Sequence, residues 1–253
     1  MNKENTIIIT GASSGIGKAL ALQYALENKN LSLISRSKDA LIPIKEQCIN
    51  YGAKNVDIIV GNVVDSELMK TIIHDIDSKY NIEIVFCSAG ISSGTADESS
   101  EIDNQIINTN ILGTINTINP IIPIMKKQKF GQIGLFSSLA QFIPIPQSSS
   151  YILTKSAIKT YGECLNLLLD NYNIGVSIIM PGFVISKMSK ASNYKNFSMM
   201  KAEKAAYLIK EGIAKKKDYI IFPKISFILL KLFSILPFVI KKYLIKQFMN
   251  EKY

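Results

Sequence analysis

The stretch "NTIIITGASSGIGKALALQ", residues 5–23, decides the fold of this chain. It begins as a short apolar run that ends at a glycine, as a buried parallel strand does. From residue 15 onward its apolar residues recur at helical spacing. A strand that passes through a glycine-rich turn into a helix predicts the first unit of an open parallel sheet.

Strands and helices continue to alternate along the rest of the chain. Short apolar runs are separated by amphipathic stretches of helical length, a pattern that requires parallel strands with helical crossovers. We therefore expect one doubly wound α/β domain with about seven parallel strands at residues 1–223, followed by an apolar and basic helical extension at residues 224–253. The expected strands are residues 5–10, 31–35, 56–62, 82–90, 130–138, 174–182 and 218–223. The expected helices are residues 15–29, 38–52, 65–80, 99–127, 148–172 and 200–215.

Composition narrows the class of protein. With 253 residues, of which 47% are hydrophobic, the chain can build one large core. The start has no room for a signal peptide, and the three cysteines form no CxxC pair, so we expect a cytoplasmic protein, with contact at the inner face of a membrane left open. The single histidine, His74, argues against a His/Cys zinc site and a Ser-His-Asp hydrolase. We expect no metal site, and His74 on a helix surface.

The turn "TGASSGIG", residues 10–17, predicts a dinucleotide site. Gly11 permits the sharp turn, Gly15 lets the backbone approach a phosphate, and Gly17 lets the helix pack closely on the sheet. The pyrophosphate then lies at the helix N-terminus, where free N–H groups favour negative charge. The alternative is a plain connection between strand and helix. The residues expected to line this part of the site are Gly11, Ser13, Ser14, Gly15, Ile16 and Gly17.

The end of the second expected strand selects between the two nicotinamide cofactors. A site for NAD usually carries an acid here, which bonds the ribose hydroxyls. Ser35 and Arg36 stand there instead. Because Arg36 can hold a 2′-phosphate with two hydrogen bonds and Ser35 does not repel it, we expect NADP(H) to be preferred over NAD(H). The alternative is that Arg36 is a solvated loop residue.

The segment "YILTK" places Tyr151 and Lys155 four residues apart on one helix, and hence on one face. A tyrosine hydroxyl has a pKa near 10, and a nearby ammonium lowers that pKa towards neutrality by stabilising the phenolate. This pattern predicts a proton donor and acceptor. Taken alone, a Tyr–Lys pair at this spacing is more often a solvated helix face.

Together, these motifs resemble the short-chain dehydrogenase/reductase family, which has the Rossmann fold. The resemblance covers about residues 5–223, and Ser186 stands where the family has a threonine. The segments that carry it are "TGASSGIG" at residues 10–17, "NTNILGT" at 108–114, Ser138 with twelve intervening residues before Tyr151, "YILTK" at 151–155 and "PGFVIS" at 181–186.

The resemblance implies a role for each of four residues. Tyr151 would protonate the carbonyl oxygen, or deprotonate the alcohol in reverse, and Ser138 would orient that oxygen. Lys155 would lower the pKa of Tyr151 and hold the nicotinamide ribose. Asn110 would support a water that relays the proton. Ser137 is the neighbouring alternative to Ser138, and spacing alone favours Ser138.

Two positions depart from the family pattern. The family usually has NNAG where this chain has "CSAG", residues 87–90, so Cys87 is expected to be a buried small hydrophobe and Ser88 to carry less of the local bonding. An asparagine, Asn62, replaces the usual Asp that bonds adenine. An amide can still accept that bond. The further cofactor contacts that the resemblance implies are Asn62, Val63, Ser88, Ala89, Gly90, Tyr151, Lys155, Pro181, Gly182 and Val184.

The implied activity is an NADPH-dependent carbonyl reductase, or an alcohol dehydrogenase in reverse. The alternative is a non-catalytic NADP-binding scaffold or sensor at the membrane surface. A pseudoenzyme is expected to have lost at least one catalytic residue, whereas all four are present here.

The segment after the sixth expected strand bears on the substrate. Its adaptable apolar residues, Met188, Phe197, Met199 and Met200, favour an apolar or lipid-like small molecule, although ordinary packing explains them about as well. The resemblance also implies a homodimer or homotetramer, paired through the helices that hold Asn110 and Tyr151.

The basic charge of the chain is concentrated near its end. Residues 201–253 hold twelve lysines and four acids, which accounts for +8 of the formal charge of +9. These lysines are interleaved with aliphatic bulk, so we expect no nucleic-acid partner and peripheral, in-plane membrane contact through residues 224–246. Pro237 predicts two short helices.

The faces of these two helices are also predicted. Lysines 241, 242 and 246 are expected to reach towards anionic headgroups. We expect the segment to help wall the substrate pocket as well, and the rival interpretation is an arm that covers its own domain or a partner subunit. The expected apolar faces are Phe227, Leu230, Phe233 and Ser234 on the first helix, and Val239, Ile240, Tyr243 and Leu244 on the second.

Overall fold

The computed structural model describes residues 3–92, 100–186, 189 and 199–250. A single sheet of seven strands runs through it in the order β3-β2-β1-β4-β5-β6-β7, and every pair of neighbours is parallel. The predicted doubly wound α/β fold is therefore confirmed. The strands are β1 (Asn5–Thr10), β2 (Asn30–Ser35), β3 (Asn55–Val60), β4 (Asn81–Cys87), β5 (Gly131–Phe136), β6 (Ile174–Pro181) and β7 (Tyr219–Phe222).

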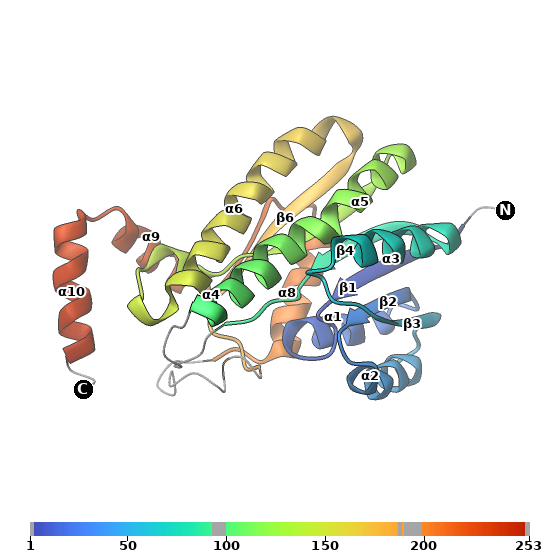
Figure 1. Ribbon diagram of the computed structural model, residues 1–253, viewed down its shortest axis with the longest axis horizontal. Helices are drawn as coiled ribbons and strands as arrows, with labels where there is room; N and C mark the ends of the chain where they lie inside the picture. Colours follow the sequence, from blue (N-terminus) through green and yellow to red (C-terminus); the bar gives the residue numbers. More distant parts are fainter. Residues whose placement is uncertain (1–2, 93–99, 187–188, 190–198, 251–253) are drawn as a thin grey trace.

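Helices cover both faces of the sheet (Figure 1). One face is packed by α1, α2 and α8, and the other by α3, α5 and α6. Neighbouring residues of β1 alternate between the two cores: Ile7 and Ile9 face the first, and Ile8 faces the second. The helices of this layered domain are α1 (Gly15–Ala25), α2 (Lys38–Asn50), α3 (Ser66–Lys79), α4 (Ser100–Ile107), α5 (Gly113–Gln128), α6 (Ser149–Leu169) and α8 (Ala202–Ala214).

Several expected elements differ from the observed ones at their ends. The first helix stops at Ala25, before residue 29, and β4 stops at Cys87, before residue 90. Residues 88–90 leave the sheet because pairing with both neighbours of β4 ends at Cys87. The side chain of Asp65 caps α3 by accepting from the N–H of Leu68 at 3.0 Å. His74 is exposed on α3, as predicted.

The order of the strands places the functional edge. From β1 the chain crosses over to β2 in one direction, and from β4 it crosses over to β5 in the other. The loops after β1 and β4 therefore leave the carboxyl edge of the sheet in opposite directions. The loop after β1 is the glycine-rich turn. The loop after β4 is residues 88–92, and hydrogen bonds from Ser88 and Ala89 to Thr10 hold its start beside the glycine-rich turn.

The chain after β7 forms two further helices, α9 (Lys224–Ser234) and α10 (Phe238–Asn250), and Pro237 lies between them, as predicted. Figure 1 shows α10 standing away from the body of the domain. Among the described residues, no helix is both long enough and apolar enough to cross a bilayer. The division of the chain at residue 223 stays a prediction.

The predicted apolar face of α9 contacts the domain. Two of its four residues, Phe227 and Leu230, pack on a small cluster of buried residues at the edge of the domain. The cluster consists of Leu139, Ile178 and Met180. For this helix, the rival interpretation of an arm that covers its own domain accounts for these two residues.

We predict that Gly17→Ala lowers the free energy of unfolding by about 1–3 kcal/mol, since the cost of overpacking applies here. A Cβ at this position would lie 2.5 Å from the carbonyl oxygen of Gly11 and 2.6 Å from Oγ of Ser88. Urea denaturation measures the change. Gln23→Ala on the same helix is the control. Equal stability of the two variants would contradict the close approach of α1 to the sheet.

Candidate active site

The glycine-rich turn has a geometry that favours glycine at three positions, and Gly15 is one of them, with a φ of +55°. Gly11 has a φ of +66°, and a Cβ there would lie 2.7 Å from the backbone of Ala89. Gly17 brings the first turn of α1 against the turn itself, as described above. These two contacts place the start of α1 directly beside the loop after β4. Ser13, Ser14, Gly15 and Ile16 lie between them and are half-buried.

The N-terminus of α1 is suited to an anion. Ser14 takes the N-cap position but, within the described part of the chain, its side chain makes no capping hydrogen bond. The first turn of α1 also contains no acidic residue. The free N–H groups of this turn therefore keep their partial positive charge for a ligand, and the residues present fit the pyrophosphate of a dinucleotide.

The loop after β4 is tied to β1 by two hydrogen bonds. The Ser88 hydroxyl donates to the carbonyl oxygen of Thr10, and the N–H of Ala89 donates to the Thr10 hydroxyl at 3.2 Å. The Ser88 side chain thus holds the loop to β1 through its hydroxyl. Cys87 is buried, as predicted, and burial raises the pKa of its thiol.

The expected adenine end of the site lies after β2 and β3. Ser35 is buried, and its hydroxyl donates to the carbonyl oxygen of Ser37 at 3.0 Å. Arg36 is exposed, and none of the residues that the structure describes pairs with its guanidinium. Asn62 is exposed beyond β3 and its side chain accepts from the N–H of Val64, while Val63 is buried beneath it.

Tyr151, Ser138 and Lys155 converge at the carboxyl ends of β5 and β6. A hydrogen bond joins the side chains of Tyr151 and Ser138. The ammonium of Lys155 lies 5.4 Å from the centroid of the Tyr151 ring, and it donates to the carbonyl oxygen of Phe136 at 2.9 Å. Ser138 follows β5, and the other two residues lie on α6. The structure thus brings together a phenol, a hydroxyl and a cation.

The two neighbouring serines, Ser137 and Ser138, have different hydrogen-bond partners. Ser137 is buried and its hydroxyl donates to the carbonyl oxygen of Lys155 at 2.7 Å, which anchors α6 to β5. Gln141 donates to Ser137 in turn. Ser138 is the one whose hydroxyl meets Tyr151, so geometry and spacing favour the same serine.

Burial dominates the titration of this group. It raises the pKa of Tyr151, and the hydrogen bond with Ser138 opposes the rise. Burial also lowers the pKa of Lys155 to about 8. The expected net lowering of the Tyr151 pKa is therefore wrong for the protein alone. The cost of desolvating the phenolate outweighs the Ser138 bond, and the Lys155 ammonium donates to Phe136.

Asn110 lies on a single turn of π-helix, η1 (Asn108–Leu112), which joins α4 to α5. π turns inside α-helices are frequent at functional sites. Its side-chain oxygen accepts from the N–H of Ile91 at 2.9 Å, and its amide donates to the carbonyl oxygen of the same residue and to the Thr154 hydroxyl, both at 3.0 Å. Asn110 thereby joins the loop after β4 to the helix that carries Tyr151.

Thr154 is the residue that sequence reasoning missed. It is fully buried, and its hydroxyl accepts from Asn110 and donates to the carbonyl oxygen of Tyr151 at 2.7 Å. It lies inside the "YILTK" motif, where a polar residue between the two functional ones was the available signal. Gly90 completes this corner, because a Cβ there would lie 3.1 Å from Oδ1 of Asn110 and 3.8 Å from Nζ of Lys155.

The segment after β6 lies next to the glycine-rich turn. The N–H of Gly182, next to Pro181, donates to the carbonyl oxygen of Phe222 at 2.8 Å. Val184 is buried and pairs with Met200 in an isolated bridge. A Cβ at Gly15 would lie 3.4 Å from Cβ of Ser186, which places this segment over the turn. Met199 and Met200 are half-buried. Met188 and Phe197 lie outside the described residues.

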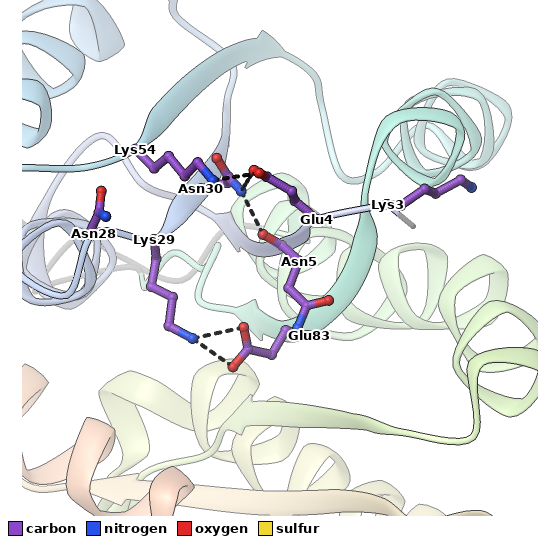
Figure 2. Close-up of a pocket in the computed structure, with 8 residues that line it drawn as sticks. All are labelled: Lys3, Glu4, Asn5, Asn28, Lys29, Asn30, Lys54 and Glu83. Carbon is purple, nitrogen blue, oxygen red and sulfur yellow. Dashed lines mark hydrogen bonds and ion pairs between the residues drawn. The ribbon is translucent and has the colours of Figure 1, made fainter. Parts of the chain in front are cut away.

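The opposite edge of the sheet offers a competing hollow of about 380 Å³ at the start of β1 and β2 (Figure 2). Its charged groups are already paired. Lys29 contacts the Glu83 carboxylate at 3.0 Å, and Lys54 contacts Glu4 at 2.5 Å. The third lysine of the hollow, Lys3, contacts Asp77 at 3.7 Å. Because each charged group that lines the hollow has an ion-pair partner, the carboxyl edge remains the candidate site.

Known proteins place this arrangement in a family. Residues 5–196 match the family model for short chain dehydrogenases. A Staphylococcus epidermidis protein described as an uncharacterized oxidoreductase is 31% identical over 208 residues, which is 81% of this chain and 88% of that protein. The 11-beta-hydroxysteroid dehydrogenase-like 4A protein of Arabidopsis thaliana is 32% identical over 182 residues, which is 70% of this chain and 60% of that protein.

Solved structures agree on the fold. A short-chain dehydrogenase from Sphingobium yanoikuyae, in complex with NADPH, superposes with a TM-score of 0.80 at 22% identity, over 87% of this chain and 88% of that one. A short-chain dehydrogenase/reductase from Burkholderia phymatum, in complex with NAD, gives a TM-score of 0.82 at 21% identity, over 91% of this chain and 92% of that one. This chain therefore belongs to the short-chain dehydrogenase/reductase family of NAD(P)-dependent oxidoreductases, which act on CH–OH and C=O groups.

Proposed function

We propose that this chain is an NADPH-dependent oxidoreductase that reduces a ketone, or oxidises the corresponding secondary alcohol in reverse. The observation that carries the proposal is the meeting of Tyr151 with Ser138, with the Lys155 ammonium 5.4 Å from the tyrosine ring. A proton donor, a polarising hydroxyl and a cation stand at the same edge as a turn suited to pyrophosphate. This set is what carbonyl reduction requires of a protein.

The chain's own residues perform the proton chemistry. In reduction, Oη of Tyr151 gives its proton to the carbonyl oxygen, while the Ser138 hydroxyl donates a hydrogen bond to the same oxygen and orients it. The Lys155 ammonium stabilises the phenolate that remains and would hold the nicotinamide ribose. When bound, the nicotinamide would supply the hydride in this direction and accept it in the other. Asn110 acts as a positioning residue, through Ile91 and Thr154.

We predict that Tyr151→Phe lowers kcat by about 10²- to 10⁴-fold, because it removes a general acid and leaves the ring in place. Binding of NADPH, followed by fluorescence titration, is expected to stay unchanged. Tyr161→Phe on the same helix is the matched control. Unchanged turnover in Tyr151→Phe would contradict the mechanism. A wild-type protein that binds NADPH but turns over no ketone would favour the scaffold alternative.

The reaction is expected to depend on pH through Lys155. Burial lowers the pKa of this lysine to about 8, so its charge is mostly present at neutral pH and is lost as the pH rises through that value. Tyr151 stays protonated over the same range because burial raises its pKa. We predict that kcat/KM for reduction is level near neutrality and falls above pH 8, as the Lys155 ammonium loses its charge.

A series of initial rates across buffers measures this profile. Lys159→Gln, one turn further along α6, is the control and is expected to keep the wild-type profile. A reductive rate that stays level well above pH 8 would show that the charge on Lys155 does not matter to the reaction.

The preference for NADP(H) is the finer part of the proposal. It rests on Arg36, which is exposed beyond β2 with its guanidinium unpaired among the described residues, next to the small uncharged Ser35. A guanidinium can bind a 2′-phosphate through two hydrogen bonds without losing another partner. NAD lacks that phosphate, so the same residue offers it no charge pairing.

We predict that Arg36→Ala weakens NADPH binding by about 10- to 100-fold, the worth of a charge-assisted hydrogen bond, and leaves NADH binding nearly unchanged. Equilibrium titration with each nucleotide measures both. Lys45→Ala on α2 removes the same charge without facing the site and serves as the control. An equal effect of Arg36→Ala on the two nucleotides would contradict the assignment of Arg36 to the 2′-phosphate.

We propose an apolar or lipid-like ketone as the substrate. The printed name of the Arabidopsis relative, a hydroxysteroid dehydrogenase-like protein, supports this class. Met200 packs against the main core, which favours a packing role for this residue over a role in a substrate pocket. The segment that follows Ser138 is itself apolar: Leu139 is buried and Phe142 packs beside it.

We also propose a homodimer or homotetramer. Exposed leucines on α6, among them Leu167 with 79% of its surface exposed, and Leu168 beside it, support pairing through this helix. This pairing would involve the helices that hold Asn110 and Tyr151.

A further inference from the structure

The C-terminal helices present ten exposed apolar side chains that nothing in the described structure covers. We call this set the outer face. We propose that the outer face binds the surface of an anionic lipid bilayer, lying in its plane. The outer face consists of Ile225, Ile228, Leu229, Leu232 and Ile235 from α9 and the turn after it, and Phe238, Val239, Ile240, Tyr243 and Leu244 from α10.

The helix α9 is apolar on two sides, and its own domain accounts for only one. Its inner side packs through Phe227 and Leu230 on the cluster at the domain edge. Its other side carries Ile225 and Leu229, which are 75% and 62% exposed. A surface helix normally turns charged residues away from its core, and a helix that is apolar all round is buried all round. A second apolar environment is therefore needed on the outer side.

The helix α10 also lacks packing against its own domain within the described part of the chain. It has thirteen residues and stands away from the domain (Figure 1). Isolated helices of this length are marginal in water, since most helical stability comes from packing of an apolar face. Val239 is 77% exposed, and Tyr243 one turn later is 61% exposed. Contact with a partner surface would supply the packing that the domain does not.

Charge identifies the partner as anionic lipid. Residues 224–250 contain five lysines and no acidic residue. Lys224 borders the outer face on α9, and Lys242 and Lys246 border it on α10. A second copy of this chain would bring the same positive charges against them, which disfavours a symmetric dimer here. An anionic surface receives both the apolar side chains and the lysines that surround them.

The geometry restricts how the bilayer is met. Neither helix reaches the roughly 20 residues needed to span a membrane, and Pro237 separates them. The outer face therefore lies along the interface, with its apolar side chains at the boundary between headgroups and acyl chains and its lysines reaching back to the headgroups.

The same contact brings the candidate active site towards the lipid. The rings of Phe227 on α9 and Phe142 lie 5.7 Å apart, and the Lys231 ammonium lies 5.4 Å from the Phe142 ring. Phe142 ends the short helix η2 (Leu139–Phe142), which begins directly after Ser138. Access of a membrane-dissolved ketone from this side rests on the proposed function, whereas lipid binding itself does not.

Vesicle flotation with the full-length protein tests the proposal. The protein is expected to float with vesicles of phosphatidylcholine and phosphatidylglycerol, to float much less with phosphatidylcholine alone, and to be released by added salt. The double variant Leu229→Ser with Leu232→Ser should lower the bound fraction more than tenfold, because each leucine loses its apolar burial. Leu26→Ser with Ile49→Ser, two exposed positions on the far side, is the matched control.

A charge variant tests the choice of lipid independently. Lys242→Glu with Lys246→Glu is expected to reduce binding by roughly 25-fold or more, at about fivefold for each basic residue lost. Lys70→Glu with Lys127→Glu makes the same charge change elsewhere and should keep binding. NADPH titration of each variant confirms that the domain is folded and is independent of lipid binding.

Three results would overturn the proposal. The first is equal flotation with both kinds of vesicle, and the second is no flotation with either. The third is a change of molecular mass by light scattering in the leucine variant without any loss of flotation, which would assign the outer face to a second copy. Loss of ketone reduction with flotation intact would count against the proposed function alone.

Discussion

The close contact between the start of α1 and the loop after β4 is the constraint on which the rest of the site depends. Gly17 allows it, and Thr10 holds it through Ser88 and Ala89. From that loop, Ile91 bonds to Asn110, which bonds in turn to Thr154 beneath Tyr151. A continuous set of hydrogen bonds therefore runs from the turn suited to phosphate to the residue suited to proton transfer. Displacing any one of them would move cofactor and proton donor relative to each other.

Much of this was visible in the sequence, and for definite reasons. The strand and helix periods differ, so "NTIIIT" and the helix after it were distinguishable, and seven such units predicted the parallel sheet. Spacing alone selected Ser138 over Ser137, and the structure gives each serine a different partner. Pro237 broke the last helical stretch because proline cannot continue a helix. Local rules of this kind depend on residues only a few positions apart, so they can be applied without knowledge of the fold.

Features that depend on three-dimensional surroundings were out of reach. The pKa of Tyr151 follows from how deeply its hydroxyl is buried, and no spacing rule states that depth. The side of α9 that contacts the domain depends on the cluster around Ile178, which is assembled from distant parts of the chain. Thr154 looked like an ordinary helix residue until Asn110 was placed opposite it. In each case the missing information was a neighbour far away in the sequence.

The π turn at Asn110 has a consequence for the architecture of the whole face. Figure 1 shows α4 and α5 in sequence along this side of the sheet. A π turn accommodates one extra residue, which rotates everything beyond it by roughly 100°, the angle that one residue occupies around a helix. The apolar stripe is therefore re-phased halfway along. Before the turn the helix packs against α6, and beyond it the helix packs against α3. One nearly continuous rod thus serves two different neighbours, and the point of re-phasing is the residue that connects the loop after β4 to α6.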